Sequence, residues 1–244
     1  MPADCANELQ LDISKNMTKV HEAEKRFEEY RDNLRREVGL LADYVHLFRG
    51  IQKLKKRYVF EINYAPAFFS LITKSVFSTI ILWVDKLLDE KGQRGVFDFL
   101  RLVEASVDIF AIEALKCRRK FPDDYWVLRE RRKEGELTIK HVVKDRERLR
   151  NLRCLQSITT RRDKYHAHFD KEYFFDLHRL DRDAPVAVRD LGNAVRALWS
   201  ILNKYSAAYD GTSYPSTAAN INDVERILRH LREFRKHQRE GCMD

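Results

Sequence analysis

The chain has 244 residues with a formal net charge of +8, and both glycine (8) and proline (5) are scarce. This length can bury a real core in one large domain or in two small ones. Scarce Gly and Pro beside abundant Leu, Ala, Glu, Lys and Arg predict an all-α protein with short connections. The four cysteines form no CxxC pair, which argues against a zinc ribbon or a disulfide framework and favours reduced thiols.

The first half of the chain predicts two long helices. Apolar residues spaced three and four apart give one stripe from about residue 20 to Phe48, and Gly50 is the expected break. Pro66 disfavours helical geometry in the residue before it, so it marks a kink or a fresh helix start. That second helix should end near Asp89, because a Gly-containing turn follows.

The second of these helices carries the most apolar window of the chain, Pro66 to Val84. Lys74 and several Ser and Thr residues interrupt this window, whereas a membrane span wants about 20 predominantly apolar residues. We therefore expect a buried core helix and no membrane association. The first residues lack the basic and apolar regions of a secretory signal, so we expect a soluble, cytoplasmic protein.

The second half predicts further helices over residues 96–119, 123–133, 137–168 and 183–209, and a basic amphipathic helix over residues 221–238. Asp123 and Asp183 are the expected N-caps of two of these helices. Pro185 would then lie in the first turn of the helix that Asp183 caps. Residues 211–217 form a polar linker ahead of the basic helix.

The positive charge is concentrated between Lys116 and Lys164, where 17 Lys and Arg face 8 Asp and Glu. This excess favours RNA as a partner, because phosphate contacts dominate nucleic-acid affinity. A solvated helical face with interspersed ion pairs is an equally good interpretation of the charge alone, and Asp145 to Arg148 has such a pattern.

The most crowded polar stretch is Thr159 to Asp170, which holds two arginines, a lysine, two histidines and two carboxylates. Histidine can exchange a proton near neutral pH, and neighbouring cations can hold a phosphate, so the combination suits phosphodiester chemistry. On an unbroken α-helix, Arg162 shares a face with His166, whereas His168 lies about 240° away. Arg161 and His168, seven residues apart, also share a face. Helical geometry leaves these three Arg–His pairings open.

The residues Arg162-Asp-Lys-Tyr-His-Ala-His-Phe-Asp170 resemble the signature of HEPN domains, in which Arg, a polar residue and Lys precede Ala-His. The closest likeness is to the abortive-infection, AbiU-like branch. A second patch, Ile62–Phe69 followed by Ile80–Asp89, resembles the upstream helix of that branch. The resemblance covers about residues 40–209. It implies a HEPN-like up-and-down helical bundle (40–209) with an N-terminal helical extension (1–39) and a C-terminal linker and basic helix (210–244).

The resemblance also implies a function. HEPN ribonucleases cleave RNA without a metal, by attack of the ribose 2′-hydroxyl on the adjacent phosphate, and two protomers bring their motifs together at a two-fold interface. In this sequence the implied catalytic residues are Arg162 for the phosphate, His168 for acid–base chemistry and Asp163 to orient them. Residues expected to bind the substrate are Arg161, Lys164, Tyr165 and His166. We thus expect a homodimeric endoribonuclease that acts as a toxin or antiphage defence effector, with RNA and a cognate antitoxin or regulatory protein as partners.

The sequence leaves other interpretations of the motif and of the chain open. The motif could be a structural ion-pair network, with Asp170 serving as a helix cap. The chain could be a HEPN-like module that binds RNA, nucleotide or a partner without catalysis, or it could be a purely structural scaffold. His166 and His168 with Asp170 or His178 could bind a metal, but alternate helical positions diverge, so we expect neither metal nor cofactor. Tyr173 lies near the motif, as does a modified tyrosine in some HEPN toxins, although its spacing departs from theirs.

Overall fold

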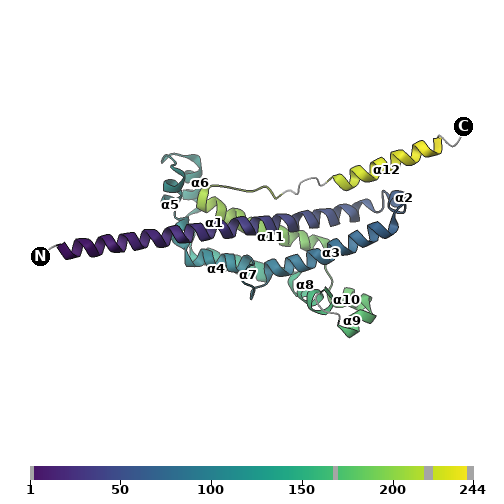
Figure 1. Ribbon diagram of the computed structural model, residues 1–244, viewed down its shortest axis with the longest axis horizontal. Helices are drawn as coiled ribbons and strands as arrows, with labels where there is room; N and C mark the ends of the chain where they lie inside the picture. The colour runs from purple at the N-terminus through teal and green to yellow at the C-terminus, as the bar shows by residue number, and fades with distance from the viewer. Residues whose placement is uncertain (1–2, 167–169, 217–221, 241–244) are drawn as a thin grey trace. The chain divides into compact units, whose positions relative to one another are not determined.

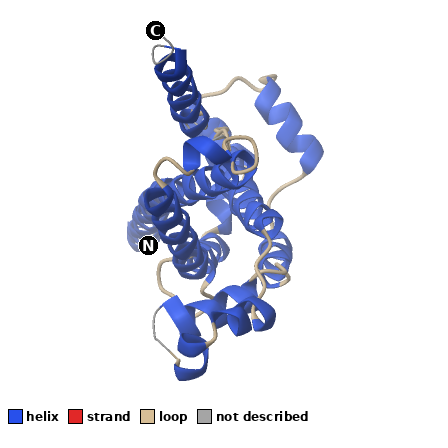
Figure 2. Cartoon of the chain, turned by 90° about the vertical axis from the view of Figure 1, so that its right-hand side faces the viewer, coloured by secondary structure: helices blue, strands red, loops and turns tan. Residues whose placement is uncertain are grey.

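A computed structural model describes residues 3–166, 170–216 and 222–240. Every regular element in this part of the chain is helical, which confirms the all-α prediction (Figures 1 and 2). In chain order the elements are α1 (Ala3–Leu54), α2 (Val59–Ile62), α3 (Pro66–Leu88), α4 (Val96–Ala105), the 3-10 helix η1 (Val107–Phe110), α5 (Ile112–Arg119), α6 (Trp126–Glu134), α7 (Ile139–Arg150), α8 (Leu155–Arg161), the π-helix η2 (Arg162–His166), α9 (Lys171–Phe175), α10 (Leu177–Asp183), α11 (Val188–Asp210) and α12 (Asp223–Glu240).

The elements group into two compact units, each built from separate parts of the chain. The first unit comprises the described residues of Met1–Arg36, Asp89–Arg150 and Leu198–Pro215. The second comprises those of Glu37–Leu88, Asn151–Ala197 and Ser216–Asp244. The long helices α1 and α11 each contribute one end to each unit. The proposed extension, bundle and tail boundaries at residues 39 and 209 stay a prediction.

An aromatic cluster forms the centre of the first unit. The ring of Phe27 on α1 lies edge-on to Phe110 at 5.0 Å and 4.6 Å from Tyr209 on α11. Tyr205, also buried, donates a hydrogen bond to the buried carboxylate of Asp145 on α7 at 2.8 Å. Burial and this hydrogen bond raise the pKa of Tyr205. The phenol therefore stays protonated and keeps donating its hydrogen bond from α11 to α7.

The second unit is built on the contact between the C-terminal part of α1 and α3. Phe48 on α1 packs against Phe77 on α3 at 5.3 Å, and the Trp83 indole N–H donates to Glu37 at 3.2 Å. The second half of α3 is buried through Ile80, Ile81 and Val84. Helices α8 and η2 pack against α3, which brings the motif segment to this core.

The boundaries expected at Pro66 and Gly135 were predicted correctly, but the break at Gly50 and the continuity of two later segments were not. α3 begins at Pro66 and α6 ends before Gly135, which has φ +81°. In contrast, α1 continues through Gly50 to Leu54, because the buried Ile51 and Leu54 offset the modest cost of an interior glycine. The segments expected as single helices over residues 96–119 and 137–168 are each broken into three pieces.

Both expected N-caps were wrong. Asp123 does not cap α6, because its carboxylate pairs with Lys116 at 2.5 Å and with Arg132 at 3.8 Å instead. Asp183 ends α10, where it accepts hydrogen bonds from Tyr173 and Arg179. α11 starts only at Val188, beyond the proline expected in its first turn.

Helix α3 departs from the expected core helix in its first half. Its second half is buried, but Phe68 and Leu71 are 57% and 67% exposed. Among the described helices, only α3 is long and apolar enough to cross a membrane by length and composition, with 22% of its most apolar window buried. Core helices of soluble proteins pass the same test, so this property is weak evidence for a membrane. The cytoplasmic location stays a prediction.

Candidate functional site

The motif lies where a regular helix gives way to a π-helix. α8 ends at Arg161, and the next five residues, Arg162–His166, form η2. A π-turn holds more residues than an α-turn and is frequent at functional sites. The expected 240° separation of Arg162 and His168 requires an unbroken α-helix, whereas α8 ends at Arg161. His168, together with Ala167 and Phe169, lies outside the described residues.

Arg162 is held by two carboxylates. Its Nε donates to Asp163 at 2.7 Å and its Nη1 donates to Asp85 at 2.8 Å. The Asp85 side chain is 8% exposed, whereas Asp163 is 51% exposed. The hydrogen bond to Asp163 and the negative charge of Asp85 raise the pKa of Arg162 further above its ordinary value. Nη2 makes no hydrogen bond with any described residue, and the side chain is 32% exposed, so one edge of the fork can receive an anion.

Asp85 was not among the site residues predicted from sequence. It comes from α3, 77 positions before Arg162, within the second patch that carried the resemblance. A signal was present, because Asp85 is the one carboxylate inside the apolar stretch Ile80–Leu88, at a position that the helical period places among buried neighbours. A buried carboxylate needs a cation, and Arg162 supplies it.

The adjacent Arg161 has a different environment. Its side chain is 7% exposed and donates to the carbonyl oxygen of Ala184 at 2.6 Å and to Asp181 at 2.7 Å. The guanidinium also lies over the Phe77 ring at 5.5 Å. These contacts tie α8 to the end of α10, which is a structural role. Its predicted part in substrate binding stays a prediction.

His166 is half-buried between aromatic rings. Its ring lies 6.5 Å from Phe77 on α3 and 5.3 Å from Tyr165, both edge-on. Its Nε2 is buried and makes no hydrogen bond with a described residue. Burial, and secondly the positive charge of Arg161, lower the pKa of His166 below its ordinary value. The structure thus favours a neutral imidazole here.

Lys164 and Asp170 close the motif with an ion pair. Lys164 Nζ lies 2.9 Å from Asp170, and this hydrogen bond lowers the pKa of the Asp170 carboxyl and raises that of Lys164. Asp170 also accepts a hydrogen bond from the backbone N–H of Glu172 at 3.0 Å. It is the N-cap of α9, as the structural interpretation of this residue predicted.

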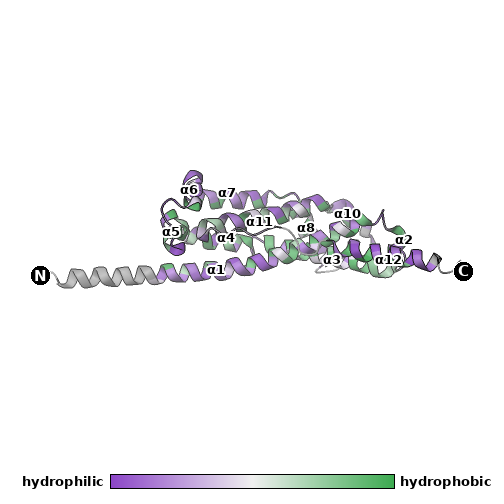
Figure 3. Cartoon of the chain, turned by 90° about the horizontal axis from the view of Figure 1, so that it is seen from above, coloured by the Kyte–Doolittle hydropathy of each residue, from purple (hydrophilic) through white to green (hydrophobic). Residues whose placement is uncertain are grey.

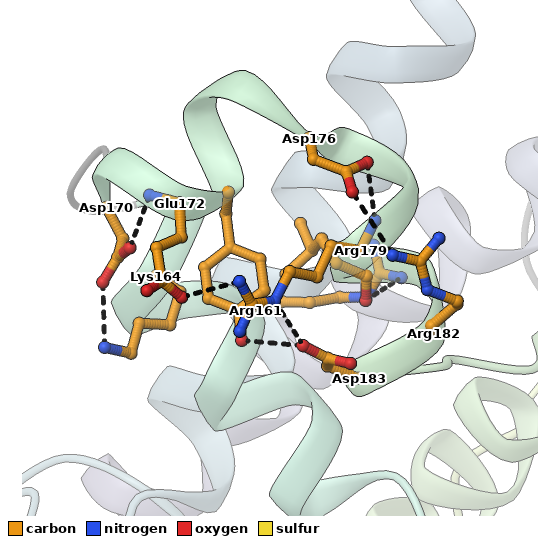
Figure 4. A network of polar contacts seen from close by, with 10 residues as sticks. Arg161, Lys164, Asp170, Glu172, Asp176, Arg179, Arg182 and Asp183 are labelled. Atoms are coloured by element: carbon orange, nitrogen blue, oxygen red, sulfur yellow. Dashed lines mark hydrogen bonds and ion pairs between the residues drawn. The ribbon is translucent and has the colours of Figure 1, made fainter.

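A network of ion pairs continues from this cap across α9 and α10 (Figure 4). Arg179 reaches Glu172 at 2.9 Å and Asp183 at 3.3 Å, and Arg182 reaches Asp176 at 3.3 Å. Tyr173 donates to Asp183 at 3.1 Å, and burial followed by this contact raises the pKa of its phenol. Most of these side chains are solvent-exposed, so the network orders a short helical hairpin without contributing much stability.

Metal binding gains no support from the described residues. They contain no group of three His, Cys, Asp or Glu side chains arranged to hold a metal ion. The candidate metal ligands named from the sequence include His168, which lies outside the described residues. That set of ligands as a whole is therefore untested.

The basic segment contains two kinds of cation. Several make ion pairs with other elements of the first unit: Arg118 with Glu24 on α1, Arg146 with Glu104 on α4, and Arg150 with Glu90 in the turn after α3. Asp145 likewise pairs with Lys204 across helices, and not with its sequence neighbours. Others, among them Arg119, Lys120, Arg129, Lys140 and Lys144, make no ion pair with a described residue. The ion-pair interpretation of the charge therefore holds for the first group, and RNA binding by the second group stays a prediction.

Comparison with known proteins places the chain in a family. Neither a curated protein nor a solved structure gives a significant match. The family model of AbiU2, a HEPN family, matches residues 24–230. This range exceeds the 40–209 expected from the two patches and includes α2, α3, the motif and the first part of α12. The chain belongs to the AbiU2 family of HEPN proteins.

Proposed function

We propose that this protein is a metal-independent endoribonuclease that acts as a toxin or abortive-infection effector in antiphage defence. The observation that carries the proposal is the environment of Arg162. A buried and an exposed carboxylate fix its guanidinium, while Nη2 makes no hydrogen bond with a described residue. Membership of the AbiU2 family supports it. The second candidate is a non-catalytic module, in which the same fixed arginine holds the phosphate of a bound RNA or nucleotide.

The reaction needs three chemical roles. A base removes the proton of the ribose 2′-hydroxyl, the 2′-oxygen forms a bond to phosphorus, and the bond to the 5′-oxygen breaks as that oxygen takes up a proton. The products are a 2′,3′-cyclic phosphate and a 5′-hydroxyl end. His168 is proposed for the proton transfers. Arg162 is proposed to stabilise the charge on the phosphoryl oxygens through its free edge, with Asp85 and Asp163 holding it in place.

The proposed site is completed by a second copy of the chain. An exposed apolar stripe runs along α2 and the first half of α3 through Phe60, Tyr64, Phe68 and Leu71, which are 57–72% exposed. Leu71 and Asp85 are 14 residues apart, close to four helical turns, so both residues lie on the same side of α3. Large apolar side chains exposed in a row mark interaction surfaces. A second copy seated there would cover the first half of the helix that carries Asp85.

The deciding experiment is incubation of purified protein with a mixed RNA pool in EDTA, beside Arg162→Ala and His168→Ala. A matched control is Arg153→Ala, because Arg153 is exposed and makes no ion pair with a described residue. We expect cleavage by wild type and by the control but not by the two motif variants, with 2′,3′-cyclic phosphate ends. Unchanged cleavage in both motif variants would refute the site. Motif-dependent RNA retention with no cleavage would favour the binding module.

A further inference from the structure

A row of aromatic rings lies on the surface of the first unit, outside the motif. Phe121 and Tyr125, in the connection between α5 and α6, stack with ring centres 4.2 Å apart and planes 25° from parallel. The ring of Trp126, the first residue of α6, lies 6.1 Å from Tyr125. Trp126 is 60% exposed, which is unusual for the largest apolar side chain.

The packing of α6 does not account for this exposed tryptophan. α6 is anchored by its opposite face, where Leu128 is fully buried with Ile112 and Leu115 of α5. Phe121, Tyr125 and Val127 pack partly against that cluster, but Trp126 is not among its members. The helix would keep its core contacts without the indole, so the exposed ring is available for a partner.

The charges around the aromatic row favour a polyanion. On α5, α6 and their connection, four of the five carboxylates are neutralised by ion pairs, and only Asp124 has no cation within reach among the described residues. Three cations, Arg119, Lys120 and Arg129, make no ion pair there. Arg119 and Lys120 can be explained by the C-terminus of α5, where cations are stabilising. Arg129 is not at the C-terminus of a helix, so this stabilisation does not explain it. It lies one helical turn from Trp126, on the same face of α6.

We propose that Trp126, backed by Tyr125 and Phe121 and flanked by Arg129, Lys120 and Arg119, is a stacking platform for single-stranded RNA. Unpaired bases stack on exposed aromatic rings whatever their sequence, and neighbouring arginines and lysines contact the phosphates. A duplex hides its base faces, so the platform discriminates against double-stranded RNA. The choice of RNA as the ligand rests on the proposed function, and the platform adds a second RNA-binding surface apart from the motif.

The test measures binding separately from cleavage. A fluorescein-labelled 12-residue oligouridylate with 2′-O-methyl groups has no 2′-hydroxyl to attack phosphorus, so it is bound but not cut. Its fluorescence anisotropy is titrated with the full-length protein and with Trp126→Ala, Trp126→Phe, Arg129→Ala and Lys144→Ala. Lys144 on α7 is the matched control, because it is exposed and makes no ion pair with a described residue. Thermal melts followed by circular dichroism confirm that each variant is folded.

We expect Trp126→Ala to weaken binding roughly tenfold, as loss of one stacked base does. Trp126→Phe should keep most of the affinity, and Arg129→Ala should lose more than Lys144→Ala. Equal affinity of wild type and Trp126→Ala, equal losses in the two charge variants, or no binding by wild type would each overturn the platform. Loss of RNA cleavage in Arg162→Ala would then still support the proposed function. Conversely, Trp126-dependent binding by a protein that cuts no RNA would leave the platform standing and the ribonuclease refuted.

Discussion

At the scale of single residues, the two neighbouring arginines of the motif have opposite environments. Arg161 is buried and its guanidinium donates to backbone oxygens and Asp181, whereas Nη2 of Arg162 makes no hydrogen bond with a described residue. Both residues look alike in the sequence. The difference comes from Asp85, a buried carboxylate on another helix that fixes the orientation of Arg162.

Replacing Asp85 should impair the reaction more than replacing Asp163. Asp85→Asn keeps the shape of the side chain but removes its charge, so Arg162 is less firmly oriented toward the phosphate. We expect RNA cleavage to fall on the order of 10- to 100-fold, chiefly in kcat, because small misplacements of a catalytic group have effects of that size. Asp163→Asn, which changes the more exposed partner, should lose less. Single-turnover cleavage assays measure both, and an unimpaired Asp85→Asn would contradict a positioning role.

His166 should make stability depend on pH. Its pKa is lowered in the folded protein, so the unfolded chain binds a proton more readily between the folded pKa and the ordinary value near 6.5. Its contribution to stability is therefore full above about pH 6.5 and falls as the pH drops through this window. We expect His166→Gln to lose less free energy of unfolding than wild type between pH 7.5 and 5.5. Urea titrations at both pH values test this, and equal losses would show that His166 does not titrate as described.

At the scale of elements, α12 packs on α1 and α2 through both apolar side chains and ion pairs. Leu228 is fully buried with Leu54 and Tyr58, and the carboxylate of Glu61, 1% exposed, faces both Arg232 and Arg235 at 3.2 Å. The hydrogen bond from Arg232 lowers the pKa of Glu61, followed by smaller contributions from both arginine charges. The predicted basic amphipathic helix is thus confirmed, but its charges serve docking as well as solubility.

Removing the two arginines of this contact should release α12. Arg232→Ala with Arg235→Ala leaves the Glu61 carboxylate buried without a counter-charge, which is costly and is relieved when the helix moves away. We expect amide hydrogen exchange over residues 223–240 to become at least about tenfold faster while α1 and α3 keep their protection. Arg229→Ala is the control, because Arg229 is exposed and makes no ion pair with a described residue. If the double variant and the control exchange alike, the ion pairs do not hold the helix.

Element boundaries show where local sequence signals stop being sufficient. Pro66 and Gly135 act through their own backbone geometry, so the boundaries that they set were predictable. The break between α7 and α8 and the π-turn at Arg162 have no such residue. They occur where α8 and η2 pack against α3 while Arg162 reaches Asp85, which is a tertiary requirement.

At the scale of the whole molecule, the proposal of a shared site in a dimer can be tested by mixing inactive variants. If Arg162 of one copy works with His168 of the other, a dimer of one Arg162→Ala chain and one His168→Ala chain has one intact site. We expect a mixture of the two, after subunit exchange, to recover about a quarter of wild-type cleavage at random pairing. Leu71→Lys should prevent recovery by placing a charge in the apolar stripe. Sedimentation velocity monitors the dimer, and no recovery by an exchanged mixture would place each site within one chain.

The sequence by itself determined the helical class, the helix start at Pro66, the basic segment and the polar motif that carries the family resemblance. These features are local, because periodicity, backbone restriction and charge density act within a few turns of chain. Only the tertiary structure decided that Asp85 fixes Arg162, that Arg161 is buried, that half of α3 is exposed, and that α12 packs on α2. Each of these depends on side chains far apart in the sequence, and whether a charge is buried, paired or free is settled by which helix packs against it.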